Sequence, residues 1–442
     1  MNNSVLISLL TAIVSLSIAF NSDRAYAASV AGLHSASVEV ASQQNDDRSA
    51  AFTIALNQVL IKVSGDEANL LTPGLNAMLN SPEVYVQTYS YRDNPDYLAY
   101  LQFRLSQQPK TQGVEKPAPQ SAEKQTLEQP LPYILDVSFS AESVENKMNS
   151  FGLPIWGAVR PSILMWVVSE QNGERKITSS SDSAVTDVAE TVAQQRGLPI
   201  YFPVVDLADI SAVDIDELWG LFPESVESAS RRYAPDVVVM VRLVDIGGDG
   251  WSGDWLVRTK QEMLSGSRSG VDLLGLWQGL LAQVSSNLAS RYAVRKSGER
   301  LKDYIDISVS NVSTFKDYAR LKKYLQALPP VSTSMLSWVN RGEVGYRIEL
   351  AGTRDQFYEH IALGKGLVPQ LRNLINTSGP AVESDPLLLE QEGAGSTQLD
   401  REPESEFDVE LRLFSQGSQN NTTDKGALVE YFSWDSVGAA SL

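Results

Sequence analysis

The sequence predicts a multidomain protein of the α/β and α+β classes, with a central α/β, sandwich-like domain, a small α+β N-terminal unit and a ferredoxin-like C-terminal domain. Its short apolar runs, such as 163–168 and 237–241, are β-branched and bounded by Pro or Gly, which is typical of strands buried on both faces. Helical patterns lie between these runs, as in an alternating α/β core. A length of 442 residues exceeds one compact core and indicates two or three domains.

Composition limits the classes of partner and chemistry. There are 54 acidic and 36 basic residues, giving a net charge of -18, which disfavours binding to nucleic acid or to anionic lipid. Cysteine is absent, which excludes thiol nucleophiles, disulfides, thiolate metal sites and the lipid-modified cysteine of a bacterial lipoprotein. A hydrophobic content of 43% is that of a globular chain.

The first 27 residues have the features of a signal peptide. The apolar run from Val5 to Phe20 is 16 residues long, short of the roughly 20 that span a bilayer. Ala25-Tyr26-Ala27 is a small-x-small cleavage signature, so we expect cleavage after Ala27 and a periplasmic location. No Lys or Arg precedes the apolar run, and an uncleaved membrane anchor stays open as the alternative.

Residues 28–106 are predicted to form the N-terminal α+β unit. The expected elements are a strand at 35–40, a helix from Asp46 or Asp47 to Gly65, and hairpin strands at 84–91 and 97–105. Residues 107–131 are rich in Gln, Lys, Glu and Pro, as is typical of a linker or exposed loop.

Residues 132–298 are predicted to form the central α/β domain. The expected elements are strands at 133–139, 162–169 and 200–205, helices at 141–151, 183–195, 209–222 and 224–233, a hairpin at 237–245 and 250–259, and a closing helix at 273–292.

Residues 299–442 are predicted to form the ferredoxin-like domain. The order from 304 to 363 is β-α-β-β-α, which lacks one strand of a ferredoxin-like unit. We expect 427–434 to supply that strand after an acidic, low-complexity insertion at 378–406, and 407–414 to add a further one.

Catalytic motifs are scarce in this chain. The two histidines, His34 and His360, fall in different predicted domains, and neither is in the central domain, which disfavours a Ser-His-Asp triad. The chain has no Gly-x-Ser-x-Gly elbow, no phosphate-binding Gly-rich loop and no His-Glu-x-x-His pair. We therefore expect no metal, no cofactor and no catalytic residue.

One carboxylate pair is a candidate site. Asp206 and Asp209 follow a predicted buried strand, where they are able to act as the acid and nucleophile of a glycosidase or to bind a hard cation. The structural interpretation is favoured, because strand-to-helix turns routinely end in Asp. On that interpretation Asp209 caps the helix and Asp206 pairs with an arginine, while Arg232 forms an ion pair with a nearby Asp.

A second candidate is aromatic and cationic. Trp156 and Arg160 flank a predicted turn and can form a stacking site for a sugar or peptide. A structural cation–π contact is the alternative, and Trp166 is expected in the core. The candidate binding residues are therefore Trp156, Arg160, Asp206, Asp209 and Arg232.

Several short motifs carry a family resemblance. They are Gly152-Leu153-Pro154-Ile155-Trp156, Arg160-Pro161, Arg196-Gly197-Leu198-Pro199, Asp206-Leu207-Ala208-Asp209 and Ala229-Ser230-Arg231-Arg232-Tyr233. Together they resemble the exported proteobacterial family described as domain of unknown function number two-zero-six-six, over nearly the whole mature chain. That resemblance implies no reaction, ligand or catalytic residue. The central domain also resembles, more weakly, two kinds of envelope α/β domain. These are the amino-terminal domain of the Tol-system propeller protein and the outer-membrane activators of peptidoglycan synthases.

These observations favour a soluble, non-catalytic periplasmic protein that binds or scaffolds components of the cell envelope. The expected partner is another envelope protein or peptidoglycan, with no nucleic acid and no transmembrane span after signal cleavage. Two alternatives stay open. One is a carboxylate-dependent glycan hydrolase that uses Asp206 and Asp209, and the other is a protein held to the inner membrane by an uncleaved N-terminal helix.

Overall fold

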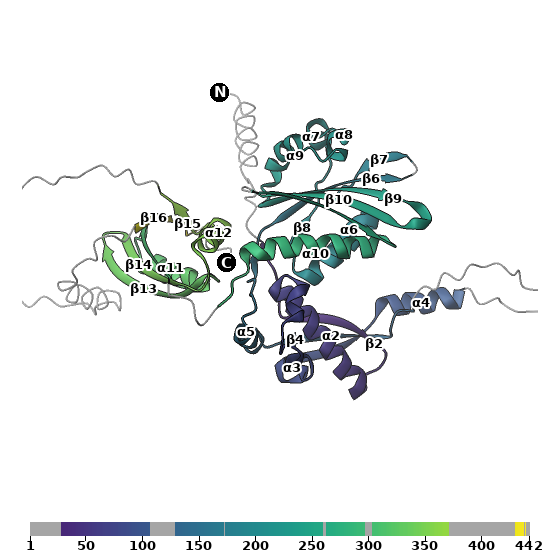
Figure 1. Cartoon of the computed structure of the whole chain (residues 1–442), viewed down its shortest axis with the longest axis horizontal. Coiled ribbons are helices and arrows are strands. Elements are labelled where there is room, and N and C mark those ends of the chain that lie inside the picture. Colours follow the sequence, from purple (N-terminus) through teal and green to yellow (C-terminus); the bar gives the residue numbers. More distant parts are fainter. Residues whose placement is uncertain are drawn as a thin grey trace, which may run out of the picture. The chain divides into compact units, whose positions relative to one another are not determined.

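The structure is a computed structural model that describes residues 28–106, 129–171, 173–259, 262–296, 303–370, 429–436 and 438. The expected signal peptide, most of the expected linker, the acidic insertion at 378–406 and the segment 407–414 lie outside the described residues. The chain separates into two compact units, one up to Gly298 and the other from Glu299. Both are mixtures of helices and β-sheet (Figure 1).

The first unit begins with a three-stranded antiparallel sheet in the order β2-β4-β3. The long helix α2 (Asn45–Ser64) packs on one face of this sheet, and its residues Leu56 and Val59 are fully buried there. The strands are β2 (Ser35–Val40), β3 (Val86–Asp93) and β4 (Tyr133–Phe139), and short elements complete the layer: β1 (Ala28–Ser29), η1 (Glu67–Leu71), α3 (Asn76–Leu79), η2 (Pro82–Tyr85), α5 (Ala141–Ser150) and β5 (Val159–Arg160).

The predicted hairpin at 84–91 and 97–105 is wrong in its second half. Residues Pro95–Ser106 form the helix α4 instead of a strand. Proline favours the first position of a helix, and Asn94 accepts a hydrogen bond from the Asp96 N–H through its side chain, at 3.1 Å. All the side chains of α4 remain at least partly exposed.

The predicted boundary before residue 132 is also wrong. β4 was expected to open the central domain, but it lies between β2 and β3 and is the middle strand of the first sheet. Its residues Leu135, Val137 and Phe139 are at most 2% exposed and pack in the same core as α2. Residues 132–155 therefore complete the N-terminal layer.

The central sheet has the order β11-β10-β9-β6-β7, with β8 paired to β6. β6 is parallel to β9, whereas β9, β10 and β11 are joined as antiparallel neighbours. The predicted hairpin of β9 and β10 is confirmed, while β7 and β11 were not predicted because neither has the apolar alternation of a half-buried strand. The strands are β6 (Ile163–Gln171), β7 (Glu174–Ile177), β8 (Ile200–Tyr201), β9 (Val237–Asp245), β10 (Trp251–Arg258) and β11 (Met263–Gly270).

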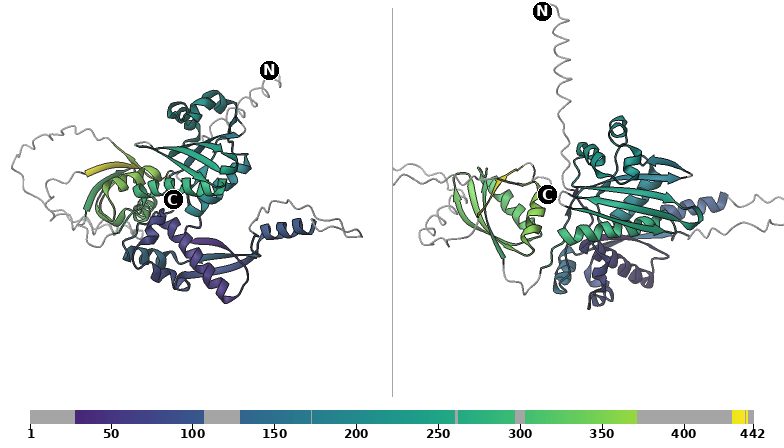
Figure 2. Two further views of the ribbon diagram at one scale, coloured as in Figure 1. Left: turned by 45° about the vertical axis from the view of Figure 1, so that its right-hand side comes forward. Right: turned by 45° about the horizontal axis from the view of Figure 1, so that its top comes forward.

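Helices cover both faces of the central sheet (Figures 1 and 2). One face is covered by α6 (Ser183–Arg196) and α10 (Leu273–Tyr292). The other face is covered by α7 (Leu207–Ala212), α8 (Ile215–Trp219) and α9 (Pro223–Ser230). Two short 3-10 helices, η3 (Arg231–Tyr233) and η4 (Gly247–Asp249), lie beside the strands. Because of this double cover, every side chain of β6 from Ile163 to Val168 is fully buried. The prediction of a strand buried on both faces is confirmed.

The second unit is a five-stranded sheet in the order β13-β14-β12-β16-β15. The predicted β-α-β-β-α order is confirmed, and the strand expected at 427–434 is found at Val429–Trp434 beside β12. β16 is parallel to β12, whereas the other paired strands of this sheet are antiparallel. The elements are β12 (Asp303–Ser310), α11 (Phe315–Ala327), β13 (Val331–Asn340), β14 (Glu343–Leu350), α12 (Arg354–Gly364), β15 (Leu367–Pro369) and β16 (Val429–Trp434).

No helix in the described part of the chain is both long enough and apolar enough to cross a membrane.

Candidate functional site

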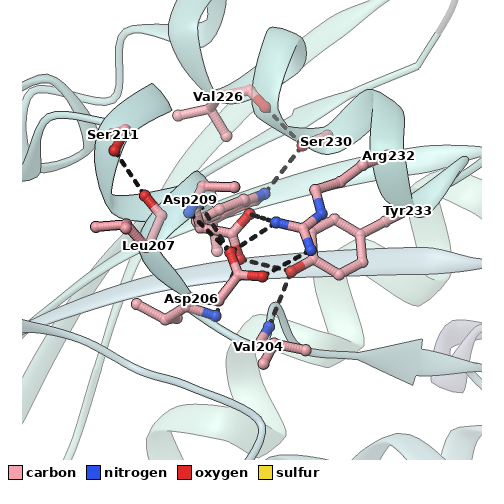
Figure 3. A network of polar contacts seen from close by, with 12 residues as sticks. Val204, Asp206, Leu207, Asp209, Ser211, Val226, Ser230, Arg232 and Tyr233 are labelled. Carbon is pink, nitrogen blue, oxygen red and sulfur yellow. Dashed lines mark hydrogen bonds and ion pairs between the residues drawn. The ribbon is translucent and has the colours of Figure 1, made fainter.

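The predicted carboxylate pair lies at the start of α7, facing η3 (Figure 3). Asp206 is the N-cap of this helix, and its Oδ1 accepts hydrogen bonds from the backbone N–H groups of Ala208 and Asp209, both at 3.1 Å. The same carboxylate forms a bidentate salt bridge with Arg232, in which Nη1 lies 2.7 Å from Oδ1 and Nη2 lies 2.8 Å from Oδ2. Planar pairing of this kind is the strongest geometry available to an arginine and a carboxylate.

Asp209 is the buried member of the pair, with 1% of its surface exposed. Its Oδ1 accepts a hydrogen bond from Arg232 Nη1 at 3.2 Å. Its Oδ2 accepts one from the Tyr233 hydroxyl at 2.6 Å and one from the Val205 N–H at 3.0 Å. The Tyr233 hydroxyl in turn accepts the Val204 N–H at 3.0 Å, so the network ties η3 to the loop before α7.

The loop held by this network contains an uncommon backbone conformation. Val205 has a φ of 57°, in the left-handed region that β-branched residues rarely occupy. Such a conformation costs about 1–3 kcal/mol and persists only where surrounding contacts hold it. The hydrogen bond from its N–H to Asp209 is one such contact.

The electrostatics of the network are those of a salt bridge. The hydrogen bonds from Arg232 hold the pKa of Asp206 at about 2, below its ordinary value, and raise the pKa of the arginine. Burial, assisted by the hydrogen bond to Asp209, raises the pKa of the Tyr233 hydroxyl. At neutral pH Asp206 is therefore ionised and unable to donate the proton that a glycosidase acid supplies.

Both carboxylates thus have structural roles, and the two roles differ from those expected. Asp209 was expected to cap the helix, but Asp206 is the cap and also the main partner of Arg232. Asp209 instead orients Tyr233 and the strained Val205. The expectation that Arg232 pairs with a nearby Asp is confirmed.

The second candidate pair, Trp156 and Arg160, is entirely inside the protein. Both side chains are 0% exposed, and the guanidinium carbon lies 4.1 Å from the indole ring centroid. With no accessible surface, the pair forms the structural cation–π contact and no stacking platform. Trp166 is likewise fully buried, with its indole N–H donating to Ser230 Oγ at 2.9 Å.

Arg160 is bound by carbonyl groups instead of a carboxylate. Its donors reach five backbone oxygens, those of Gly157 at 3.2 Å, Arg196 and Gly197 at 3.0 Å, Lys62 at 2.6 Å and Trp156 at 3.1 Å. Lys62 lies in the last turn of α2 and Arg196 is the last residue of α6, so the negative ends of two helix dipoles converge on one cation. Burial nevertheless lowers the pKa of Arg160 to about 9. We call this arrangement the carbonyl cage.

The structure therefore separates the five predicted binding residues into two structural clusters. Asp206, Asp209 and Arg232 meet between α7 and η3, whereas Trp156 and Arg160 meet at the carboxyl ends of α2 and α6. Among the residues that the structure describes, no group of three His, Cys, Asp or Glu side chains is placed to hold a metal ion.

A feature that sequence reasoning missed is a polar groove along α2 and α6, whose Ser, Thr and Gln residues form no recognisable motif.

Comparison with known families corrects the predicted relationship. Residues 27–157 match a family described as a domain of unknown function (DUF8605), and the expected membership of family number two-zero-six-six is wrong. The matched segment includes β4 and α5, so it covers the whole three-stranded layer that the structure shows. No curated protein and no solved structure matches the chain, and the expected likeness to the two envelope α/β domains is not supported.

Proposed function

We propose that this protein is a non-catalytic binding or scaffolding component of the bacterial cell envelope, exported to the periplasm by the predicted signal peptide. One observation carries the non-catalytic part of the proposal. The two carboxylates best placed for hydrolysis are committed to Arg232, Tyr233 and backbone N–H groups. A partner protein or peptidoglycan remains the expected ligand.

We also infer a finer description of the folds. Helices on both faces of the central sheet support an α/β sandwich, as in other layered α/β domains. In the second unit, the β-α-β-β-α order and the sheet order β13-β14-β12-β16 support a ferredoxin-like domain. In this interpretation β15 is an additional edge strand, and β16 joins β12 in parallel.

The proposal is tested by crosslinking the native protein in intact cells, purifying it from the periplasmic fraction, identifying bound proteins and glycans, and sequencing its amino terminus. A chain beginning at Ala28 with a reproducible partner supports the proposal. A retained Met1 refutes export with cleavage and supports the membrane anchor.

The hydrolase alternative is tested with Asp206→Asn and Asp209→Asn, assayed for glycan cleavage beside the wild-type chain. An exposed carboxylate outside the network, Asp187, provides the matched control as Asp187→Asn. We expect no cleavage by any of the four proteins. Cleavage by the wild type that both network variants lose while they keep the native circular-dichroism spectrum would refute the proposal.

A further inference from the structure

The first unit carries a polar groove that neither candidate cluster uses. It consists of two cavities of about 600 and 570 Å³, and both are lined by Gln58 of α2 and Gln195 of α6. The two cavities therefore adjoin at these glutamines. The first extends over the face of the β2-β4-β3 sheet that points away from the α2 core, and the second extends along α10 to β11.

The first cavity is lined largely by hydroxyl and amide groups, together with the charged residues Lys62, Arg92 and Asp136. Because side chains alternate along a strand, the residues opposite the core-facing positions of β3 and β4 face this cavity. Thr88, Ser90 and Ser138 lie there, and their side chains make no hydrogen bond within the described part of the chain. Gln194 and Gln195 of α6 line the cavity with side-chain amides that are equally unpaired among the described residues.

The second cavity adds positive charge. Arg268 of β11 is exposed at its rim and forms no ion pair with the residues that the structure describes. Arg196 is 8% exposed; its Nη2 contacts Glu67 and lies 3.5 Å from the Gln278 carbonyl oxygen, while its buried Nη1 has no partner among the described residues. The carbonyl cage fixes the backbone of Arg196, because Arg160 binds the carbonyl oxygens of Arg196 and Gly197.

Charge in the groove differs from that of the whole chain. Four basic residues line the two cavities, namely Lys62, Arg92, Arg196 and Arg268, against the two acidic residues Asp136 and Glu67. The complete chain has a net charge of -18. The groove therefore carries more basic than acidic residues, although the protein as a whole is acidic. An anionic group is attracted to such a groove, whereas the rest of the surface repels it.

We propose that this groove binds a glycan that carries carboxylate groups. The hydroxyl and amide side chains of the groove match the many hydroxyl and amide groups of an amino-sugar chain. Two adjoining cavities match an extended ligand, and Arg268 provides the charge-assisted contact to its carboxylate. This inference rests on the proposed binding function and specifies its ligand class.

The experiment measures binding to the full chain by isothermal titration calorimetry, using two oligosaccharides that differ in their carboxylates. One is a peptide-free oligomer of alternating N-acetylglucosamine and N-acetylmuramic acid, and the other is the neutral oligomer of N-acetylglucosamine of equal length. Arg268→Gln removes the proposed contact, and Thr191→Trp places a bulky ring in the first cavity from the exposed face of α6. Arg341→Gln, an exposed arginine outside the groove, is the matched control.

We expect the acidic oligomer to bind at least about tenfold more tightly than the neutral one, which is the usual effect of one charge-assisted hydrogen bond. Arg268→Gln should remove that difference without weakening the neutral ligand, Thr191→Trp should weaken both, and Arg341→Gln should change neither. Circular dichroism and thermal melting establish that each variant is folded.

Equal affinity for the two oligomers, or binding that is insensitive to both groove variants, overturns the proposal. Absence of binding by the folded wild type overturns it as well. A protein partner captured by the crosslinking experiment leaves the scaffolding function supported even when glycan binding fails, so the two failures are distinguishable.

Discussion

Replacing Arg160 with methionine removes the cation from the carbonyl cage while retaining an unbranched apolar side chain in place of the aliphatic part of the arginine. Five backbone carbonyl oxygens then lose their donor. A buried acceptor left without a partner costs about 1 kcal/mol or more, so the loss approaches 5 kcal/mol. Removing a buried charge offsets part of this cost, since burial already lowers the pKa of Arg160 to about 9. We expect a net loss of about 3 kcal/mol in the free energy of unfolding.

Urea unfolding of the full chain, followed by tryptophan fluorescence, measures this loss because Trp156 lies against the guanidinium. Arg341→Met is the matched control, since Arg341 is exposed and should change stability by less than about 0.5 kcal/mol. Arg160→Lys keeps a charge with fewer donors and should fall between the wild type and Arg160→Met. The reasoning is refuted when Arg160→Met unfolds within about 0.5 kcal/mol of the wild type.

Four further changes test the network and the helix ends. Asp209→Asn should destabilise the protein by about 2 kcal/mol in urea unfolding, because a buried acceptor of three hydrogen bonds loses its charge; an effect below that of the exposed control Asp187→Asn contradicts this. Asp206, whose folded pKa of about 2 lies below the unfolded value of about 3.9, stabilises the fold above pH 4, and this contribution is lost as the pH falls to 2. The stability difference between wild type and Asp206→Asn should therefore shrink across that window, and a constant difference would count against the salt bridge. Gly65→Ala should lower the melting temperature, because its φ is 76° and the added Cβ would clash with Ala289 Cβ and lie 2.7 Å from Trp156 Cε3; an unchanged melting temperature would contradict this crowding. Val205→Asn should stabilise by about 1 kcal/mol, since Asn tolerates a φ of 57° better than Val, and a loss of stability in urea would refute the strain.

Local patterning predicted most of the elements whose residues repeat at regular spacing. β6, β9 and α10 were all predicted, because continuous apolar runs and helical spacing are local properties. α4 was mistaken for a strand because its Tyr and Phe residues favour strands, although Pro95 after Asn94 was an available signal for a helix start. The strand β4 was predicted, but its sheet was not, because the choice of partner strands is not encoded locally.

The candidate sites were likewise predictable only where they depend on local sequence. The pairing of Asp206 with an arginine was predictable from a strand-to-helix turn, but which aspartate caps α7 depends on backbone geometry. The hydrogen-bond acceptors of Arg160 are the backbone carbonyl groups of residues 62, 156, 157, 196 and 197. Because every residue has a backbone carbonyl, a sequence does not show which of them will bind an arginine. The groove was missed because scattered Ser, Thr and Gln residues are ordinary on any surface.

The position of β4 has a consequence for the order in which this chain can fold. β2 and β3 are synthesised before β4, yet they do not pair with each other. Both form their backbone hydrogen bonds with β4 alone. No part of that sheet can form until β4 begins to emerge at Tyr133, and the carbonyl cage cannot close until Gly197 has followed. A nascent chain halted before residue 133 should thus be digested throughout by protease, whereas one extending past 298 should be protected. The N-terminal layer is accordingly the first part of the chain to be made but cannot complete its sheet until β4 follows.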